Sequence, residues 1–181
     1  MSLSRAILMG WGVLAMLVLS GCNQNTENAQ IPAPQEPDGD AMGYYCGMLV
    51  VNHSGPKGQI FLKGRDDPLW FSSVRDTITF TLLPEESKAI RAIYVNDMGV
   101  ATNWNQPQPG AWVAAKDAVY VVGSDQSGGM GGPELVPFSD KAAAEQFQAA
   151  HDGTLYTFKD IPQSAVLGEP DMSPEKRKRG S

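Results

Sequence analysis

An internal repeat constrains the fold of this 181-residue chain more than any other feature of its sequence. Residues 70–80 and 137–147 share a phenylalanine, a serine and a second phenylalanine, and the matching positions (71 and 138, 72 and 139, 80 and 147) are each 67 residues apart. In both segments a short apolar strand ends in Phe-Ser, and the serine or the next residue can cap the start of a helix. The repeat therefore predicts two similar halves, each with a strand that leads directly into a helix.

The sequence favours one of these two helices more strongly than the other. Residues 141–150 are rich in alanine, with Ala143 and Phe147 on one face, and the pattern ends at Asp152-Gly153. The first helix contains the β-prone run 77–81. The repeat still favours a helix there, because tertiary context often overrides local propensity.

Apolar runs typical of strands flank both helices. They lie at 59–63, 68–71 and 90–95 in the first half and at 118–123, 134–138 and 154–158 in the second half. Each half therefore has the order β-β-α-β, and a unit of roughly 60 residues is too small to be stable alone. We expect an α+β fold in which two repeated ββαβ units, about 43–105 and 112–168, pack as one domain with mostly antiparallel sheets.

The N-terminus has the pattern of a bacterial lipoprotein signal. Arg5 precedes an uncharged apolar run, 6–19, which is shorter than the ~20 residues that a membrane-spanning helix needs. The run ends in Leu-Ser-Gly and then Cys22, which predicts a signal peptide at 1–21 and a lipid on Cys22. The alternative is an ordinary signal peptide that is cleaved near a cysteine. Because Asn23 is not an inner-membrane retention signal, we expect a lipid-anchored protein on the periplasmic side of the outer membrane.

Polar segments flank the predicted domain 43–168. Residues 22–42 contain prolines and few apolar groups, which is typical of a flexible tether from the lipid. The tail 169–181 ends in a basic cluster and is expected to be disordered and solvated, although such a cluster can also contact anionic lipid. The net charge of −6, without a basic face, argues against nucleic acid as a partner.

Cys46 is the one thiol that remains if Cys22 carries lipid, because the chain has two cysteines. It lies in Tyr-Tyr-Cys-Gly-Met, where Gly47 favours a turn near the surface. Free cysteines are often buried as small hydrophobic residues, but a reduced, unpaired thiol is unusual in an oxidising periplasm unless it has a use. A thiolate near thioethers is a donor set that selects Cu(I).

Three methionines and one histidine are candidates to join Cys46. Met98 lies in a polar turn at the end of a predicted strand, and Met130 is surrounded by four glycines that leave its thioether as the one side chain the loop presents. Met48 either shares a ligand with Cys46 or points to the opposite face of a strand. His53, seven positions after Cys46, can approach the site from a hairpin.

Several common classes of enzyme are not indicated. His53 and His151 are too far apart for a zinc spacing, and no second cysteine near Cys46 supports thiol–disulfide exchange. The glycines at 128–132 lack the strand–helix context and the partner residues of a phosphate-binding loop, and no Ser-His-Asp order is present. We therefore expect a binding protein and not an enzyme.

Taken together, these motifs resemble the NosL family, the copper-binding accessory lipoproteins of nitrous oxide reductase maturation. The residues that carry the resemblance are the lipoprotein signal, Cys46-Gly-Met with His53 downstream, the Asn-Asp-Met98 turn and Gly-Gly-Met130-Gly-Gly-Pro before a Phe-Ser helix. The resemblance covers nearly the whole mature chain, and the basic tail is its one departure.

The resemblance implies a periplasmic Cu(I) metallochaperone with Cys46, Met98 and Met130 as copper ligands. Its partners would be nitrous oxide reductase and a membrane ABC-type complex that assembles the copper–sulfide centre. It also implies a duplicated ββαβ fold similar to the core of organomercurial lyase. Carbon–mercury cleavage would need more than one thiol, so it is disfavoured. The remaining alternative is a metal-free lipoprotein scaffold that docks the ABC-type complex.

Overall fold

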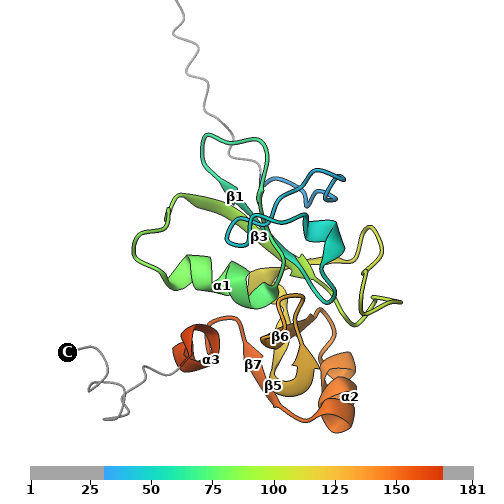
Figure 1. Ribbon diagram of the computed structural model, residues 1–181. Helices are drawn as coiled ribbons and strands as arrows, with labels where there is room; N and C mark the ends of the chain where they lie inside the picture. Colours follow the sequence, from blue (N-terminus) through green and yellow to red (C-terminus); the bar gives the residue numbers. More distant parts are fainter. Residues whose placement is uncertain (1–30, 169–181) are drawn as a thin grey trace, which may run out of the picture. The chain divides into compact units, whose positions relative to one another are not determined.

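The computed structural model describes residues 31–168, which belong to one compact unit that begins at Ile31. The predicted signal peptide, the lipidation site Cys22 and the basic tail 169–181 lie outside the described residues. The elements follow one another in this order (Figure 1): η1 (Val50–Asn52), β1 (Gly58–Leu62), β2 (Leu69–Phe71), α1 (Val74–Leu82), β3 (Ile90–Asn96), β4 (Trp112–Ala114), η2 (Ala115–Asp117), β5 (Val119–Ser127), β6 (Pro133–Phe138), α2 (Lys141–His151), β7 (Thr154–Thr157) and α3 (Gln163–Leu167).

The strands form two antiparallel sheets with the same internal order. The first sheet has the order β2-β1-β3-β4 and the second has the order β6-β5-β7. In each sheet the first strand of the repeat is central, and the helix follows the second strand. The predicted α+β fold with two ββαβ units is therefore confirmed, whereas β4 and α3 are additions that the repeat did not predict.

Both helices of the repeat begin at matching positions with a side-chain cap. At the start of α1 the Ser73 hydroxyl oxygen accepts a hydrogen bond from the Asp76 N–H at 3.0 Å. At the start of α2, 67 residues later, the Asp140 carboxylate accepts one from the Ala143 N–H at 2.9 Å. Such a cap typically stabilises a helix by about 1 kcal/mol. The β-prone run 77–81 is helical, as the repeat predicted.

α1 packs between the two halves, whereas α2 packs mainly on the second sheet. α1 contacts β1 and β2 of its own half and also β6 and α3 of the other half (Figure 1). The buried cluster that joins the halves contains residues from α1, β3, β5, β6 and α3, among them Val74, Ile78, Val95, Tyr120, Leu135 and Val166. The two units therefore share a core, as expected for units of this size.

Part of the expected tether lies against the domain. The Tyr94 hydroxyl donates to the Pro32 carbonyl at 2.7 Å, and the Gln35 backbone exchanges two hydrogen bonds of 2.9 Å with the Gln59 side chain. The Glu36 carboxylate accepts from the Trp112 indole at 3.0 Å. Residues 32–36, in the second half of the expected tether 22–42, therefore pack against the rest of the compact unit.

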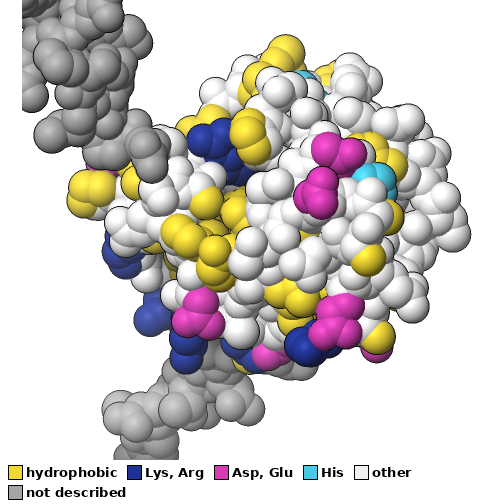
Figure 2. Space-filling view, turned by 90° about the horizontal axis from the view of Figure 1, so that it is seen from below, with side chains coloured by type: hydrophobic (Ala, Val, Ile, Leu, Met, Phe, Trp, Pro, Cys, Tyr) yellow, Lys and Arg dark blue, Asp and Glu magenta, His cyan; other side chains and the backbone are white. Residues whose placement is uncertain are grey.

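The described surface carries mixed charge. On the face that Figure 2 shows, Lys and Arg side chains lie scattered among apolar and acidic ones and form no continuous basic patch. Within residues 31–168, no helix has the length and apolar character needed to cross a membrane.

Candidate metal site

Cys46 lies at the tip of a tight turn, as the sequence predicted. An isolated antiparallel bridge joins Met42 to Leu49, and the Gly47 N–H closes the turn by donating to the Gly43 carbonyl at 2.8 Å. Gly47 has φ +63°, a left-handed conformation that favours glycine. The turn leaves the Cys46 side chain half-buried and its sulfur free of any disulfide.

Two polar side chains from distant elements face the Cys46 sulfur. The Ser72 hydroxyl, at the end of β2, lies 3.3 Å from Sγ, and His53 Nε2, just after η1, lies 4.0 Å from it. Gly43 closes the space behind the sulfur, because a Cβ on this glycine would lie 2.5 Å from Cys46 Sγ and 2.7 Å from Ser72 Oγ. The turn, the end of β2 and the segment after η1 thus converge on one sulfur atom.

The other ring nitrogen of His53 faces a backbone carbonyl oxygen. His53 Nδ1 lies 3.1 Å from the Gly129 carbonyl oxygen. A carbonyl can only accept a hydrogen bond, so Nδ1 must carry the proton. In the neutral ring the lone pair then sits on Nε2, which faces Cys46 Sγ. The Cys46 sulfur and the His53 Nε2 lone pair therefore face each other, and both atoms can coordinate a metal ion.

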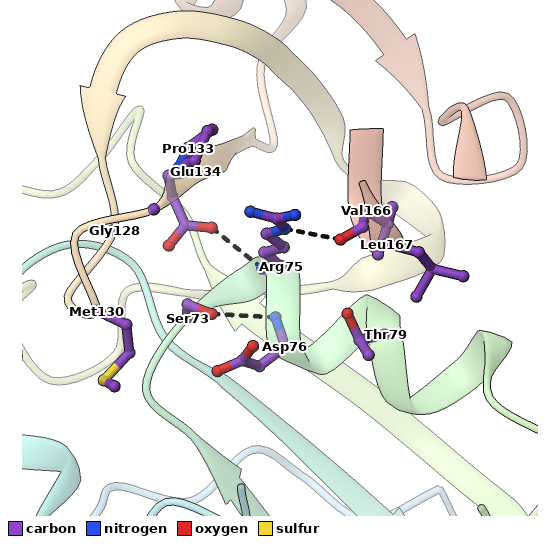
Figure 3. A pocket seen from close by; sticks show the side chains of 11 residues that line it. Ser73, Arg75, Asp76, Thr79, Gly128, Met130, Pro133, Glu134, Val166 and Leu167 are labelled. Atoms are coloured by element: carbon purple, nitrogen blue, oxygen red, sulfur yellow. Dashed lines mark hydrogen bonds between the residues drawn. The ribbon is translucent and has the colours of Figure 1, made fainter. Parts of the chain in front are cut away.

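The Met130 loop is a small closed turn next to this pair. The Gly128 N–H donates to the Gly132 carbonyl at 2.9 Å, and the Gly131 N–H donates to the Gly128 carbonyl at 2.8 Å. Met130 is 50 % exposed at the tip of the loop. Figure 3 shows its thioether across a cavity from Ser73 and Asp76 at the start of α1. The loop thus holds an accessible soft donor beside the segment that carries His53.

The other two predicted methionines lie in different surroundings. Met98 is half-buried and packs against the apolar cluster of the second half, which contains Phe138 and Val136. Its backbone N–H donates to the Pro137 carbonyl at 2.8 Å. Met48 is exposed on the Cys46 turn. Among the described contacts, Cys46 is joined to His53 and Ser72, and His53 to the Met130 loop, while Met98 is placed by apolar packing.

Hard metal donors do not gather in the part of the chain that the structure describes. Within residues 31–168, no three His, Cys, Asp or Glu side chains come close enough to hold a metal ion together. The donors around Cys46 are a thiol, one imidazole and a thioether on the neighbouring loop. This is a soft set of the kind that Cu(I) prefers.

A buried carboxyl group packs against the Met130 loop. Glu134 is 1 % exposed and lines a cavity of about 300 Å³ next to Met130 (Figure 3). Its Oε1 accepts hydrogen bonds from the N–H groups of Arg75 and Leu135, at 3.1 and 2.9 Å. Its Oε2 packs against Gly128 and has no hydrogen-bond partner among the described residues. Burial raises the pKa of Glu134 to about 8.

A buried lysine is hydrogen-bonded to a residue that packs against the same loop. Lys57 donates from Nζ to the Gly55 carbonyl at 2.9 Å, and Gly55 lies 3.7 Å from Gly128, measured from the position of its missing Cβ to the Gly128 Cα. Burial lowers the pKa of Lys57 to about 8, and the negative charge of Glu134 acts against that shift. Two buried ionisable side chains, the acid Glu134 and the base Lys57, therefore lie near this loop.

Sequence reasoning predicted Cys46 and Met130 as ligands but did not predict the contacts between the Cys46 turn, His53 and the Met130 loop. His53 was a candidate because it lies seven positions after Cys46. Ser72 was expected only as a helix-capping residue, and Gly129 only as a flexible one. The sequence signal that could have predicted these contacts is the four glycines at 128, 129, 131 and 132, because glycine allows the backbone to approach another segment closely.

Comparison with known proteins gives a consistent family. The NosL family model matches residues 34–166. The copper-binding lipoprotein NosL of Achromobacter cycloclastes is 44 % identical over 164 residues, which is 90 % of this chain and 84 % of the relative. The copper-binding lipoprotein NosL of Stutzerimonas stutzeri is 30 % identical over 161 residues, 89 % of this chain and 80 % of the relative. These relatives are named as binding proteins and not as enzymes, in agreement with the expectation from sequence.

A solved structure supports the same assignment. The crystal structure of the copper chaperone NosL from Shewanella denitrificans is 36 % identical, with a TM-score of 0.68, and the match covers 73 % of this chain and 97 % of that one. Sequence and fold thus agree over nearly all of the described residues. The chain belongs to the NosL family.

Proposed function

We propose that this protein is a periplasmic, lipid-anchored carrier of Cu(I). Its relatives carry the names copper-binding lipoprotein and copper chaperone. The observation that supports the proposal most directly is the pair of Cys46 Sγ and His53 Nε2, 4.0 Å apart, with the His53 proton held on the opposite nitrogen. Metal–ligand bonds of about 2.3 Å to sulfur and 2.0 Å to nitrogen, the lengths seen for zinc, fit an ion between two such atoms.

The cargo ion would be held by Cys46, His53 and Met130. The thiolate supplies the strongest soft bond, the imidazole a second donor, and the exposed thioether a weaker one on a small glycine loop. Met98 remains the further ligand that the family resemblance implies, although its place in an apolar cluster favours a packing role. Cu(I) tolerates low coordination, so such a shell can leave one position open.

An open position would permit transfer without a redox step. An incoming donor on the acceptor can bind first, and Met130 can then leave, because it is exposed and lies at the tip of its loop. The acceptors we propose are nitrous oxide reductase and the membrane ABC-type complex that assembles its copper–sulfide centre. Lipidation at Cys22 would keep the carrier at the outer membrane, facing the periplasm.

The first experiment measures Cu(I) binding to the lipid-free protein without oxygen, in competition with a chromophoric Cu(I) chelator. Wild type is compared with Cys46→Ser and with Met42→Leu, a control on the same turn whose side chain is 50 % exposed. We expect one tight equivalent for wild type and the control, and none for Cys46→Ser. If wild type does not compete with the chelator, the carrier proposal is wrong and a metal-free scaffold is favoured.

A further inference from the structure

The contact between His53 and Gly129 links two parts of the site that are far apart in sequence. The Gly129 carbonyl accepts from His53 Nδ1 at 3.1 Å, across 76 residues of chain. Gly129 also lies directly on the segment that carries this histidine. A Cβ at position 129 would come within 2.6 Å of the His53 Cβ and 2.7 Å of the Ser54 carbonyl oxygen. Only a glycine permits this approach.

The same glycine touches the residue that contacts the Cys46 sulfur. A Cβ at position 129 would lie 3.2 Å from the Ser72 carbonyl oxygen, and the Ser72 hydroxyl is 3.3 Å from Cys46 Sγ. Ser72 is 1 % exposed, so it has little room to move. Gly129 therefore packs against the residues that set both sides of the site. The His53 segment carries the imidazole nitrogen, and Ser72 contacts the Cys46 sulfur.

The loop can transmit the position of Gly129 to Met130, because it is closed by its own hydrogen bonds. Gly128 and Gly132 are paired at 2.9 Å, and Gly131 and Gly128 at 2.8 Å. A loop closed in this way moves more readily as a unit than as separate residues. Any change in the ring of His53 that breaks its bond to Gly129 would thus free the loop together with Met130.

We propose that Gly129 and His53 form a latch, in which the Gly129 carbonyl fixes the metal-binding tautomer of His53 and the same bond ties the Met130 loop to the site. The latch rests on the proposed function, since it assigns a positioning role within the site for the cargo ion. Gly129 acts through His53 and does not itself touch the ion. Outer-shell contacts of this kind typically change metal affinity by about 10–100-fold when they are lost.

The tautomer gives a test that needs no copper. In the metal-free protein with ¹⁵N-labelled histidine, long-range ¹H–¹⁵N spectra distinguish Nδ1–H from Nε2–H rings at about pH 8.5, where ordinary imidazoles are neutral. The chain has two histidines, so His151 serves as an internal comparison. We expect His53 to be the Nδ1–H tautomer in wild type. A His53 ring protonated on Nε2, or a mixture of tautomers, would overturn the latch.

The matched variants are Gly129→Ala and Gly132→Ala. Both change a glycine of the same loop, and neither position has a positive φ, so the difference between them is space. A Cβ at Gly132 would meet only the Arg75 guanidinium, at an ordinary 3.4 Å. We expect Gly129→Ala to mix the His53 tautomers and to weaken Cu(I) binding about 10-fold or more, and Gly132→Ala to change neither. Equal effects of the two variants would contradict the latch.

The two readouts separate the failure of the latch from the failure of the carrier. If wild type binds no Cu(I) but His53 shows the fixed tautomer that Gly129→Ala disturbs, the proposed function falls together with the metal-positioning role of the latch, and only the contact between Gly129 and His53 is confirmed. If wild type binds Cu(I) but the His53 tautomer is not fixed, the proposed function stands and the latch falls. The wild-type spectrum decides the second case even if Gly129→Ala does not fold.

Discussion

At the scale of single residues, the surroundings of each sulfur indicate its role. Cys46 faces a hydroxyl and an imidazole nitrogen, and Met130 is half-exposed on a glycine loop. Met98 instead packs against apolar side chains of the second half. Packing of this kind can be replaced by another apolar side chain of similar volume, whereas a ligand cannot.

Leucine substitutions test this difference directly. Met98→Leu conserves volume, so we expect a loss of less than about 1.5 kcal/mol in the free energy of unfolding and little change in Cu(I) affinity. Met130→Leu removes a thioether donor from an exposed position, so we expect unchanged stability and an affinity at least about 10-fold lower, equivalent to about 1.4 kcal/mol. Denaturant unfolding and chelator competition measure the two quantities. A large loss of affinity in Met98→Leu would restore Met98 as a ligand, as the family resemblance implies.

The residues that could be predicted from sequence are those with a local signal. The Gly47 turn marked Cys46, and four surrounding glycines marked Met130. The partners had no such signal, because Ser72 is 26 residues from Cys46 and Gly129 is 76 residues from His53. Their contacts depend on how the second sheet packs on the first half, and short-range patterns do not contain that information.

At the scale of elements, the start of α1 depends on a residue from the other half. Glu134 of β6 accepts the N–H of Arg75 in the first turn of α1, where the helix dipole favours a negative charge. The same carboxyl is fully enclosed, and desolvation raises its pKa to about 8. Asp76, Arg75 and Lys57 are the other charged groups near it, and burial raises the pKa of Asp76 as well. The effect of burial, which raises the pKa of Glu134, therefore outweighs the effect of the helix N-terminus, which lowers it.

Glu134 should therefore make the protein less stable as the pH rises. Its carboxyl ionises near pH 4.5 in the unfolded chain but near 8 in the fold, so between these values the folded state binds the extra proton. The stability that it contributes is complete below about 4.5 and is lost by about 8. Glu134→Gln keeps an acceptor for Arg75 and cannot ionise. We expect the variant to gain stability relative to wild type between pH 5 and pH 8, measured by urea unfolding.

An exposed glutamate provides the control for this pH series. Glu85→Gln removes one exposed carboxylate from the surface of the first half, just after α1, and we expect it to follow the wild-type pH profile. A Glu134→Gln profile parallel to that of wild type would show that Glu134 is ionised in the folded protein throughout this pH range, which would contradict the prediction.

The elements of the repeat were predicted, including the three-residue β2, whereas the short elements without a counterpart in the repeat were not. The repeat correctly predicted that α1 is a helix in spite of its threonines. The capping residues of α1 and α2 occupy matching positions of the repeat. β4 has three residues and α3 has five, too few for a hydrophobic period to be visible. Both owe their structure to contacts, β4 with the edge of β3 and α3 with α1.

At the scale of the whole molecule, the site exists because the two halves form one core. The Cys46 turn and His53 belong to the first half, and the Met130 loop joins β5 to β6 in the second. α1 contacts β6 and α3, and Leu135 and Val166 lie in the cluster shared with Val74 and Ile78. The geometry of the site therefore depends on the packing of one half against the other, and we expect the halves to unfold together.

Leu135→Ala tests this cooperativity, because Leu135 is 2 % exposed in the shared cluster. We expect a loss of about 2–5 kcal/mol in the free energy of unfolding, with faster hydrogen exchange in β1 as well as in β5. Val136→Ala, at the next position but in a cluster whose fully buried members all lie in the second half, is the comparison variant. If the halves form one cooperative unit, both variants raise exchange in β1 in proportion to their loss of stability. If hydrogen exchange rises in β5 alone, the two halves unfold as separate units. The distances around Cys46 would then depend on a mobile interface between the halves, and substitutions in the shared cluster would also change the copper affinity.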